Sequence, residues 1–150
     1  MDLPMKAFCL KGNNGKIELT IDEVFGFPGN TCIEGGYGFL GHLDLHVGSY
    51  EVHCAEFYSS TGRLHRLLAG LQTIYQTLEG TAGYKNLYEN DFQFVVEMTP
   101  FGHAAITGSF HECPHLSNEL TFEMETDQTC IGIAMNDLKA VERAFGDTIK

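Results

Sequence analysis

Three residues that can bind a transition metal lie close together in the segment "HECPH", which begins at His111. If this segment is a strand, His111, Cys113 and His115 point to one side, as the ligands of a zinc site would. Pro114 interrupts strand pairing, however, and no second pair of ligands follows nearby. Exposed polar positions therefore explain the segment better than a metal site does. A small metal-binding or enzymatic domain that uses this cluster stays the alternative.

The spacing G-x-G-x-x-G occurs at Gly36, Gly38 and Gly41. A dinucleotide site needs a strand before such glycines and a helix after them, because the helix N-terminus binds the pyrophosphate. Here turn-forming residues precede the glycines, and "HLDLHV" after them alternates like a strand. We therefore expect positive φ or a bulge at the glycines instead of a nucleotide site. Tyr37 either anchors this loop in the core or contacts a partner from its tip.

Other catalytic arrangements are equally weak in this sequence. There is no G-x-S-x-G motif, and His53 and Cys54 are adjacent on a predicted strand, so their side chains point apart. The five cysteines include no C-x-x-C pair, which favours free thiols in a reducing compartment. We predict no enzymatic activity, no catalytic residue, no bound metal and no cofactor.

The charge of the chain is its clearest bulk property. The formal net charge is -11, and residues 17–62 and 86–138 contain seven and nine acids without a single Lys or Arg. Such a field repels nucleic acids and anionic membranes and attracts basic proteins. The alternative explanation is an acidic protein that its charge keeps soluble.

Several acids share a face of a predicted strand, where their mutual repulsion costs stability unless a basic partner neutralises it. Protection of strand edges is the alternative explanation. Tyr50, like Tyr37, is a candidate aromatic contact. The predicted partner-binding residues are Asp44, Asp91, Glu97, Glu119, Glu123, Glu125 and Tyr37.

Hydrophobic periodicity predicts the elements that must position these side chains. Period-two alternation predicts strands over residues 5–12, 16–22, 42–47, 50–58, 91–98, 103–112 and 119–125. A 3.6-residue period predicts a long helix over residues 60–80, with Ser60 or Thr61 as its N-cap and Gly80 after its end. A short C-terminal helix over residues 136–146 begins at the cap Asn136.

These elements predict a single α+β domain over residues 1–150, a mainly antiparallel β-sheet covered by one long central helix, plus a short C-terminal helix. No internal repeat, signal peptide or apolar membrane segment is evident, so we expect a cytoplasmic protein. Strand order and oligomeric state stay open, and a structural subunit that self-associates through an edge strand is a further possibility.

Several short phrases occur in a fixed order along residues 15–145: "GKIELT", an "FP" turn followed by "GGY", "STG" before the long helix, "L-G" at its end, "GH…I-G", and "F-x-x-x-x-DQ" before the terminal helix. In this order the chain resembles the WapI-type immunity proteins of bacterial polymorphic toxin systems. None of the phrases is a catalytic motif, so their order alone carries the resemblance.

The resemblance implies a small cytoplasmic antitoxin that binds and neutralises the C-terminal toxin domain of a secreted protein. In the family's best-known case the toxin is similar to a tRNA-cleaving nuclease, and such toxins are usually basic. The implied partner is therefore a basic protein toxin domain, which an acidic antidote would occlude.

Overall fold

Two antiparallel sheets of four strands each dominate the structure. The computed structural model describes residues 3–33, 35–86 and 91–146. Sheet A consists of β1 (Met5–Gly12), β2 (Gly15–Val24), β3 (Gly38–Val47) and β4 (Tyr50–Ser60). Sheet B consists of β5 (Thr81–Lys85), β6 (Phe92–Thr99), β7 (His103–Phe110) and β8 (Leu120–Asp127). In both sheets the spatial order of the strands follows the chain order.

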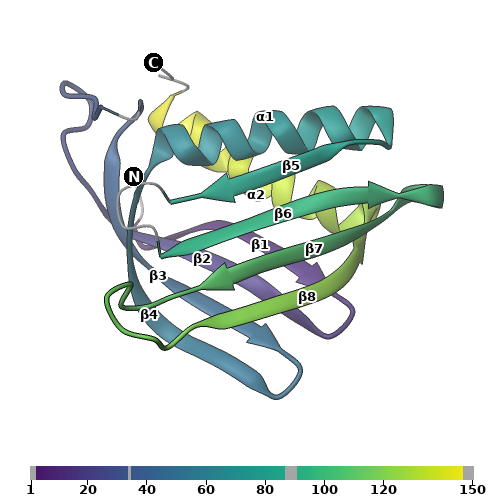
Figure 1. Cartoon of the computed structure of the whole chain (residues 1–150). Coiled ribbons are helices and arrows are strands. Elements are labelled where there is room, and N and C mark those ends of the chain that lie inside the picture. Colours follow the sequence, from purple (N-terminus) through teal and green to yellow (C-terminus); the bar gives the residue numbers. More distant parts are fainter. Residues whose placement is uncertain (1–2, 34, 87–90, 147–150) are drawn as a thin grey trace.

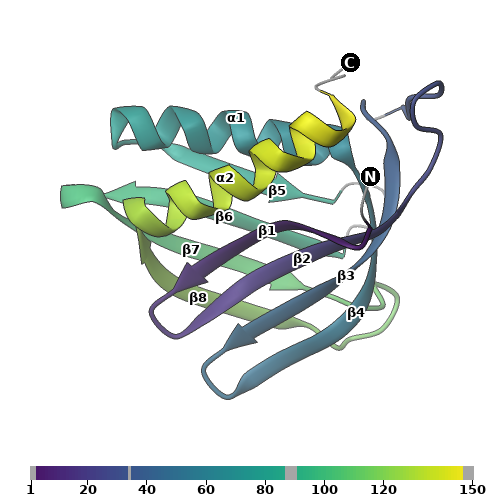
Figure 2. The same cartoon turned by 180° about the vertical axis from the view of Figure 1, so that it is seen from behind.

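A helix follows each sheet in the chain, and each helix packs against the other sheet. Helix α1 (Thr61–Thr77) follows sheet A but lies along β5, whereas α2 (Gln128–Phe145) follows sheet B and lies along β1. The two helices also contact each other, as Figures 1 and 2 show from opposite sides. The same topology of four strands and a helix therefore occurs twice, although the sequence shows no repeat.

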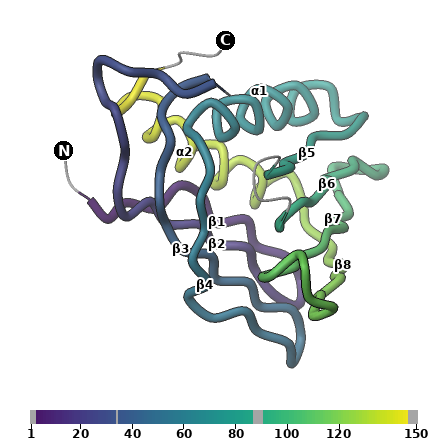
Figure 3. The backbone as a smooth tube through the Cα atoms, turned by 60° about the vertical axis from the view of Figure 1, so that its left-hand side comes forward, coloured from purple at the N-terminus to yellow at the C-terminus, as the bar shows by residue number. Residues whose placement is uncertain are grey.

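The hydrophobic core lies between the two sheets and beneath the helices, and its buried residues form one cluster. Alternate residues of β2, β3, β6 and β8 point into it, as their period-two patterns require. Aromatic rings fill much of its centre, among them Phe57, Tyr84, Phe92 and Phe94. The backbone trace in Figure 3 shows the two sheets as separate layers with the helices at one end.

The predicted α+β class is confirmed, but the predicted arrangement of one sheet under one long helix is wrong in detail. The strands divide into two sheets, and the two helices are of nearly equal length, 17 and 18 residues. The strands have the alternating pattern of a single half-exposed sheet, because each of the two sheets turns one face to the core and the other to solvent. Strand alternation reports that one face is buried, but it does not report what covers it.

The C-terminal helix is eighteen residues long and begins at Gln128, not at the predicted cap Asn136. Asp127 is its N-cap, and the side chain accepts a hydrogen bond from the Cys130 backbone N–H. Gly132 obscured this first half in the sequence, because glycine disfavours helix interiors. In the structure Gly132 lies against the ring of Tyr75 on α1, where an added Cβ would come within 3.3 Å of the ring.

Strand β5 was missed, because "TAGYK" is short and contains a glycine. Its Ala82 and Tyr84 are buried, and the strand pairs with β6. The other seven strands and α1 lie where the sequence predicts them, within a few residues at each end. Ser60 caps α1 as predicted, but Leu78 takes the left-handed position after the helix, with φ 57°, ahead of Gly80. No helix in the described part of the chain is long and apolar enough to cross a membrane.

Candidate partner-binding surface

Three carboxylates form a cluster on the outer face of sheet B. Glu97 on β6 and Glu125 on β8 lie in one row across the sheet, because both are paired through Ala105 of β7. Glu123 lies two residues before Glu125 on the same face, opposite Thr107. All three side chains are exposed. We call these three acids the acidic row. The sequence predicts the outward direction of each acid on its own strand, and the sheet brings the two strands onto one face.

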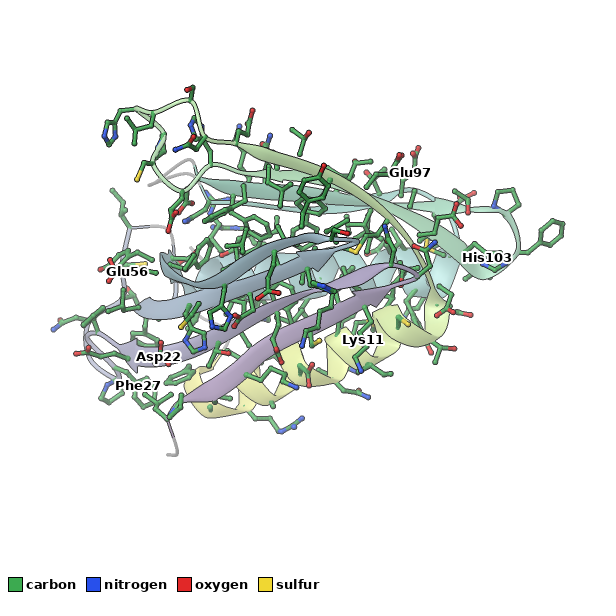
Figure 4. All side chains as sticks on the ribbon, turned by 90° about the horizontal axis from the view of Figure 1, so that it is seen from below. Lys11, Asp22, Phe27, Glu56, Glu97 and His103 are labelled. Atoms are coloured by element: carbon green, nitrogen blue, oxygen red, sulfur yellow. The ribbon has the colours of Figure 1, made fainter. Side chains whose placement is uncertain are left out.

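The acidic row has no ion-pair partner among the described residues. On the outer face of sheet A, in contrast, four acids are already engaged. Glu18 pairs with Lys6 and Lys16 at 3.3 and 3.2 Å, and Asp22 lies 2.8 Å from Nδ1 of His42. Burial raises the pKa of Glu18, but hydrogen bonds from the two lysines outweigh this and hold it below its ordinary value. The acidic row thus has no cation beside it among the described residues, whereas Glu18 on sheet A has two. Figure 4 shows Glu97 pointing outward on sheet B, away from Lys11 and Asp22 on sheet A.

Asp44 serves the structure of sheet A. Its Oδ1 accepts a hydrogen bond from the Cys54 backbone N–H at 2.9 Å, and it lies opposite an irregularity in the pairing of β3 with β4. Cys54 has φ 52° there, so the carboxylate holds a strained bulge in place. Asp44 also lies 3.6 Å from Nδ1 of His53 and 3.8 Å from Nε2 of His42. The sequence correctly predicts that Asp44 lies on an outer face. The structure places it on sheet A, whereas the acidic row lies on sheet B.

Two of the predicted contact residues, Asp91 and Tyr37, are buried. The outward direction expected for Asp91 is wrong, whereas for Tyr37 one of the two alternatives left by the sequence is confirmed. Asp91 is 7% exposed and accepts a hydrogen bond from the side-chain amide of Asn86 at 2.9 Å. Asp91 directly precedes β6, where alternation with the buried Phe92 would place it outward. Tyr37 is 5% exposed; its hydroxyl donates to the Pro28 carbonyl at 3.1 Å. Tyr37 therefore anchors its loop, and the alternative of an exposed tip fails.

Glu119 is exposed just before β8, at the opposite end of sheet B from Glu125. It borders two hollows of the surface. One, of about 500 Å³, lies between β4 and β8 and includes Tyr50 and Glu51. The other, of about 740 Å³, extends over the outer face of sheet B toward α1.

The segment His111–His115 lies in the loop after β7 and not on a strand, because β7 ends at Phe110. The ring of His111 contacts the Leu116 carbonyl instead of the other two candidate ligands. Within the described residues, no group of three His, Cys, Asp or Glu side chains could hold a metal ion. The geometry therefore gives the metal-binding alternative no support.

Sequence reasoning missed Phe101, which is 97% exposed at the tip of the turn Pro100–Gly102 between β6 and β7. This turn joins β6 and β7 at the end of sheet B that follows Glu97 in the chain. Figure 4 shows His103 at this end of the molecule, beyond Glu97. An apolar residue at the tip of a "PFG" turn was the signal available in the sequence, since turn tips are normally polar.

Comparison with known families decides the relationship that the ordered phrases suggested. The profile of the Immunity protein WapI-like family matches residues 8–146, nearly the whole chain. The chain belongs to the WapI-like immunity protein family. Neither the comparison with curated proteins nor that with solved structures gave a match. Membership of an immunity family indicates a toxin as partner and turns attention to surfaces that could bind one, among them the acidic row.

Proposed function

We propose that this WapI-like immunity protein binds the C-terminal nuclease domain of a secreted toxin in the cytoplasm and neutralises it by occlusion. The acidic row and Phe101 form the centre of the binding surface. The observation that carries the proposal is the concentration, on one outer sheet face, of three exposed carboxylates without an ion-pair partner in the described chain. Family membership supplies the class of partner.

The charge of the surface fits such a partner. A nuclease must bind a polyanion, so its substrate-binding surface is rich in Lys and Arg. A row of carboxylates held by a rigid sheet can pair with those residues and exclude the nucleic acid from them. Inhibition of this kind requires only binding, and the immunity protein neither forms nor breaks a covalent bond.

The sheet holds the backbone of the acidic row in place. The backbone of Glu125 is bonded on both sides to Asn13 of the β1–β2 turn: its N–H donates to the Asn13 side chain at 3.0 Å, and its carbonyl accepts from the Asn13 N–H at 2.7 Å. A preorganised surface loses little conformational entropy on binding, which favours the nanomolar affinity, about −12 kcal/mol, that neutralisation of a toxin demands.

Calorimetric and stopped-flow titration against the C-terminal domain of the toxin encoded next to this chain would test the proposal. We expect nanomolar binding whose association rate falls with salt. The double substitution Glu123→Lys and Glu125→Lys should slow association at low salt about tenfold or more, with a smaller effect at high salt.

The matched control is Glu51→Lys with Glu56→Lys, which makes the same change of net charge at exposed positions of β4 on sheet A. If both double variants slow association equally, the global charge and not the acidic row attracts the toxin. If the wild-type chain does not bind the toxin at all, the proposed function is wrong.

A further inference from the structure

Sheet A ends in a strand whose outer edge is open along residues 50–57. At the other edge of the sheet, β1 lies beside α2, whereas β4 has a neighbouring strand on one side only. Within the described chain, no group from outside sheet A forms a hydrogen bond with the backbone of residues 50–57. In an antiparallel sheet, alternate residues of such a strand direct their N–H and C=O groups away from the sheet. These groups can pair with the backbone of an added strand.

A groove of about 500 Å³ lies beside this edge, between β4 and the start of β8, and we call it the edge groove. Val52 and Ala55 line it from β4, and Phe110 and Leu120, which pair with each other, line it from sheet B. Ala55 and Phe110 belong to the buried core cluster, so this part of the groove is apolar. Figure 3 shows β4 and β8 at the lower margins of their layers, on the side away from the helices. Apolar atoms that enter the groove would therefore extend the core.

The rim of the edge groove is negatively charged. Glu51, Glu112 and Glu119 line it, and none of its described lining residues is Lys or Arg. Glu112 and Glu119 are exposed, and neither has an ion-pair partner in the described parts of the chain. Glu51 lies 3.5 Å from Nδ1 of His53, the lining side chain that can become cationic. Three carboxylates therefore outnumber one imidazole, and the rim stays negative in either protonation state of His53.

We propose that an extended segment of the toxin pairs with β4 and places a Lys or Arg side chain in the edge groove. This inference rests on the proposed function, which supplies the partner. The aliphatic stem of Lys or Arg suits the apolar walls, and its charged end suits the carboxylates of the rim. Tyr50, which is 67% exposed, offers its ring to the same cation. Leu120 in the groove and Glu123 in the acidic row both belong to β8, so one partner can contact both surfaces.

A second copy of this chain does not have the chemistry that the edge groove requires. Its own β4 lies within residues 17–62, which contain no Lys or Arg. Pairing of two β4 edges would instead bring Glu51 and Glu56 of one copy close to a strand of the same charge, which opposes association. Charge complementarity therefore favours a basic partner at this edge.

Hydrogen exchange of the free chain and of its complex with the toxin's C-terminal domain tests the pairing directly. The irregularity of β4 at Cys54 interrupts regular strand pairing, so we place the added strand against residues 50–53, which line the groove. Backbone amides there that do not bond to β3 are open in the free chain. They should exchange about tenfold or more slowly in the complex, because the added strand accepts their hydrogen bonds.

The substitution Asn118→Arg tests the charge of the occupant. Asn118 is exposed and lines the groove, so an arginine there fills space and repels a cationic side chain. The segment pairs after the encounter to which the acidic row contributes, so we expect mainly faster dissociation, with a dissociation constant raised about tenfold or more.

Ser117→Arg is the matched control for this variant. It makes the same charge change at the neighbouring exposed position, which does not line the groove, and should bind the toxin domain nearly as well as the wild type. The melting temperatures of both variants verify that they fold.

The outcomes separate this inference from the proposed function. Slower exchange at residues 50–53, with weakened binding by Asn118→Arg but not by Ser117→Arg, supports the inference. If the wild type binds the toxin domain, either an unchanged exchange rate at these residues or equal binding by the two arginine variants overturns the inference, although the chain is still an antitoxin. If the free chain is a dimer in gel filtration and its own association protects these amides, a second copy occupies the edge and the inference is wrong. If the wild type does not bind the toxin domain, the proposed function fails and the inference fails with it.

Discussion

At the scale of single residues, the backbone conformation explains why position 36 is a glycine. Gly36 has φ +66°, and a Cβ at this position would come within 2.2 Å of the Thr61 hydroxyl and 2.5 Å of the Gly62 backbone nitrogen. The next residue, Tyr37, donates its backbone N–H to the same hydroxyl at 2.8 Å. The glycine-rich motif thus lets a loop approach the start of α1 closely, and the positive φ that the sequence predicts for it is confirmed at this position.

Replacing Gly36 by alanine should lower the free energy of unfolding by about 2 kcal/mol or more, because the side chain meets both an unfavourable φ and backbone atoms. Urea denaturation would measure this. Gly29→Ala is the matched control. No atom lies within 4 Å of a Cβ added at Gly29, and the φ of Gly29 is not positive. The free energy of unfolding of this variant should therefore be unchanged or slightly raised. Equal stability of Gly36→Ala and the wild type would contradict the backbone role.

Phe101 shows the opposite relation between stability and function. It adopts φ 67° although it is not glycine, and its ring makes almost no contact within the chain. A bulky residue in the left-handed region costs stability, which a binding role would explain.

We therefore expect Phe101→Gly to raise the free energy of unfolding slightly, by up to about 1 kcal/mol, and at the same time to weaken toxin binding about tenfold or more. Thermal melting and calorimetric titration on the same samples would check the two signs. A variant that is more stable and binds equally well would remove Phe101 from the binding surface.

At the scale of elements, the start of α2 depends on a single side chain. Asp127 ends β8 and caps the helix, so one carboxylate sets the turn from sheet B to the helix that covers sheet A. The hydrogen bond from the Cys130 backbone N–H is the main reason that the pKa of Asp127 lies below its ordinary value.

Asp127→Ala should lower the free energy of unfolding by about 1 kcal/mol, the usual cost of losing an N-cap. Asn136→Ala, at the cap that the sequence suggested, should change stability little, because Asn136 is exposed in the middle of the helix. Equal effects of the two substitutions, measured by urea denaturation, would contradict the observed helix start.

The lowered pKa of Asp127 also predicts how acid acts on this cap. A carboxyl with a lower pKa in the folded state contributes stability at pH values above its unfolded pKa, about 3.9, and loses that contribution as the pH falls through the folded value. Asp127→Asn keeps a capping oxygen but cannot titrate. The stability difference between wild type and Asp127→Asn should therefore shrink below about pH 4; a difference that grows on acidification would show that the carboxylate is not stabilised in the folded chain.

At the scale of the whole molecule, the two halves are interlocked by their helices. α2 covers the free edge of β1, where Asp137 accepts a hydrogen bond from the Cys9 N–H at 3.1 Å, and α1 covers β5. Between the helices, Nδ1 of His65 lies 2.8 Å from a carboxylate oxygen of Glu142. Because the helix that follows each sheet packs against the other sheet, each sheet is covered only when both halves are folded.

This arrangement predicts that the halves unfold in one cooperative transition. Leu138→Ala, at a residue of α2 that is 2% exposed, should lower the free energy of unfolding by about 2–5 kcal/mol and reduce hydrogen-exchange protection in both sheets equally. Ile133→Ala, on the exposed face of the same helix, is the control and should have little effect. Loss of protection confined to sheet A would show that the halves unfold separately.

The sequence by itself determined seven of the eight strands, the strong helix, the cap Ser60 and the outward direction of Glu97, Glu123 and Glu125. All of these follow from local periodicity or from a bond between neighbours in the chain, which is why they could be predicted. The exclusion of a nucleotide site also followed from local order, since β3 and not a helix comes after the glycines.

Only the tertiary structure decided which of these elements meet. Alternation shows that a strand buries one face, but strands of one sheet and strands of two sheets have the same pattern. The packing of each helix on the other sheet has no counterpart in the local sequence. For the same reason Asp91 could not be recognised as buried, and Arg63, Arg66 and Lys85 could not be recognised as neighbours. They line the same hollow because α1 turns away from sheet A and packs along β5.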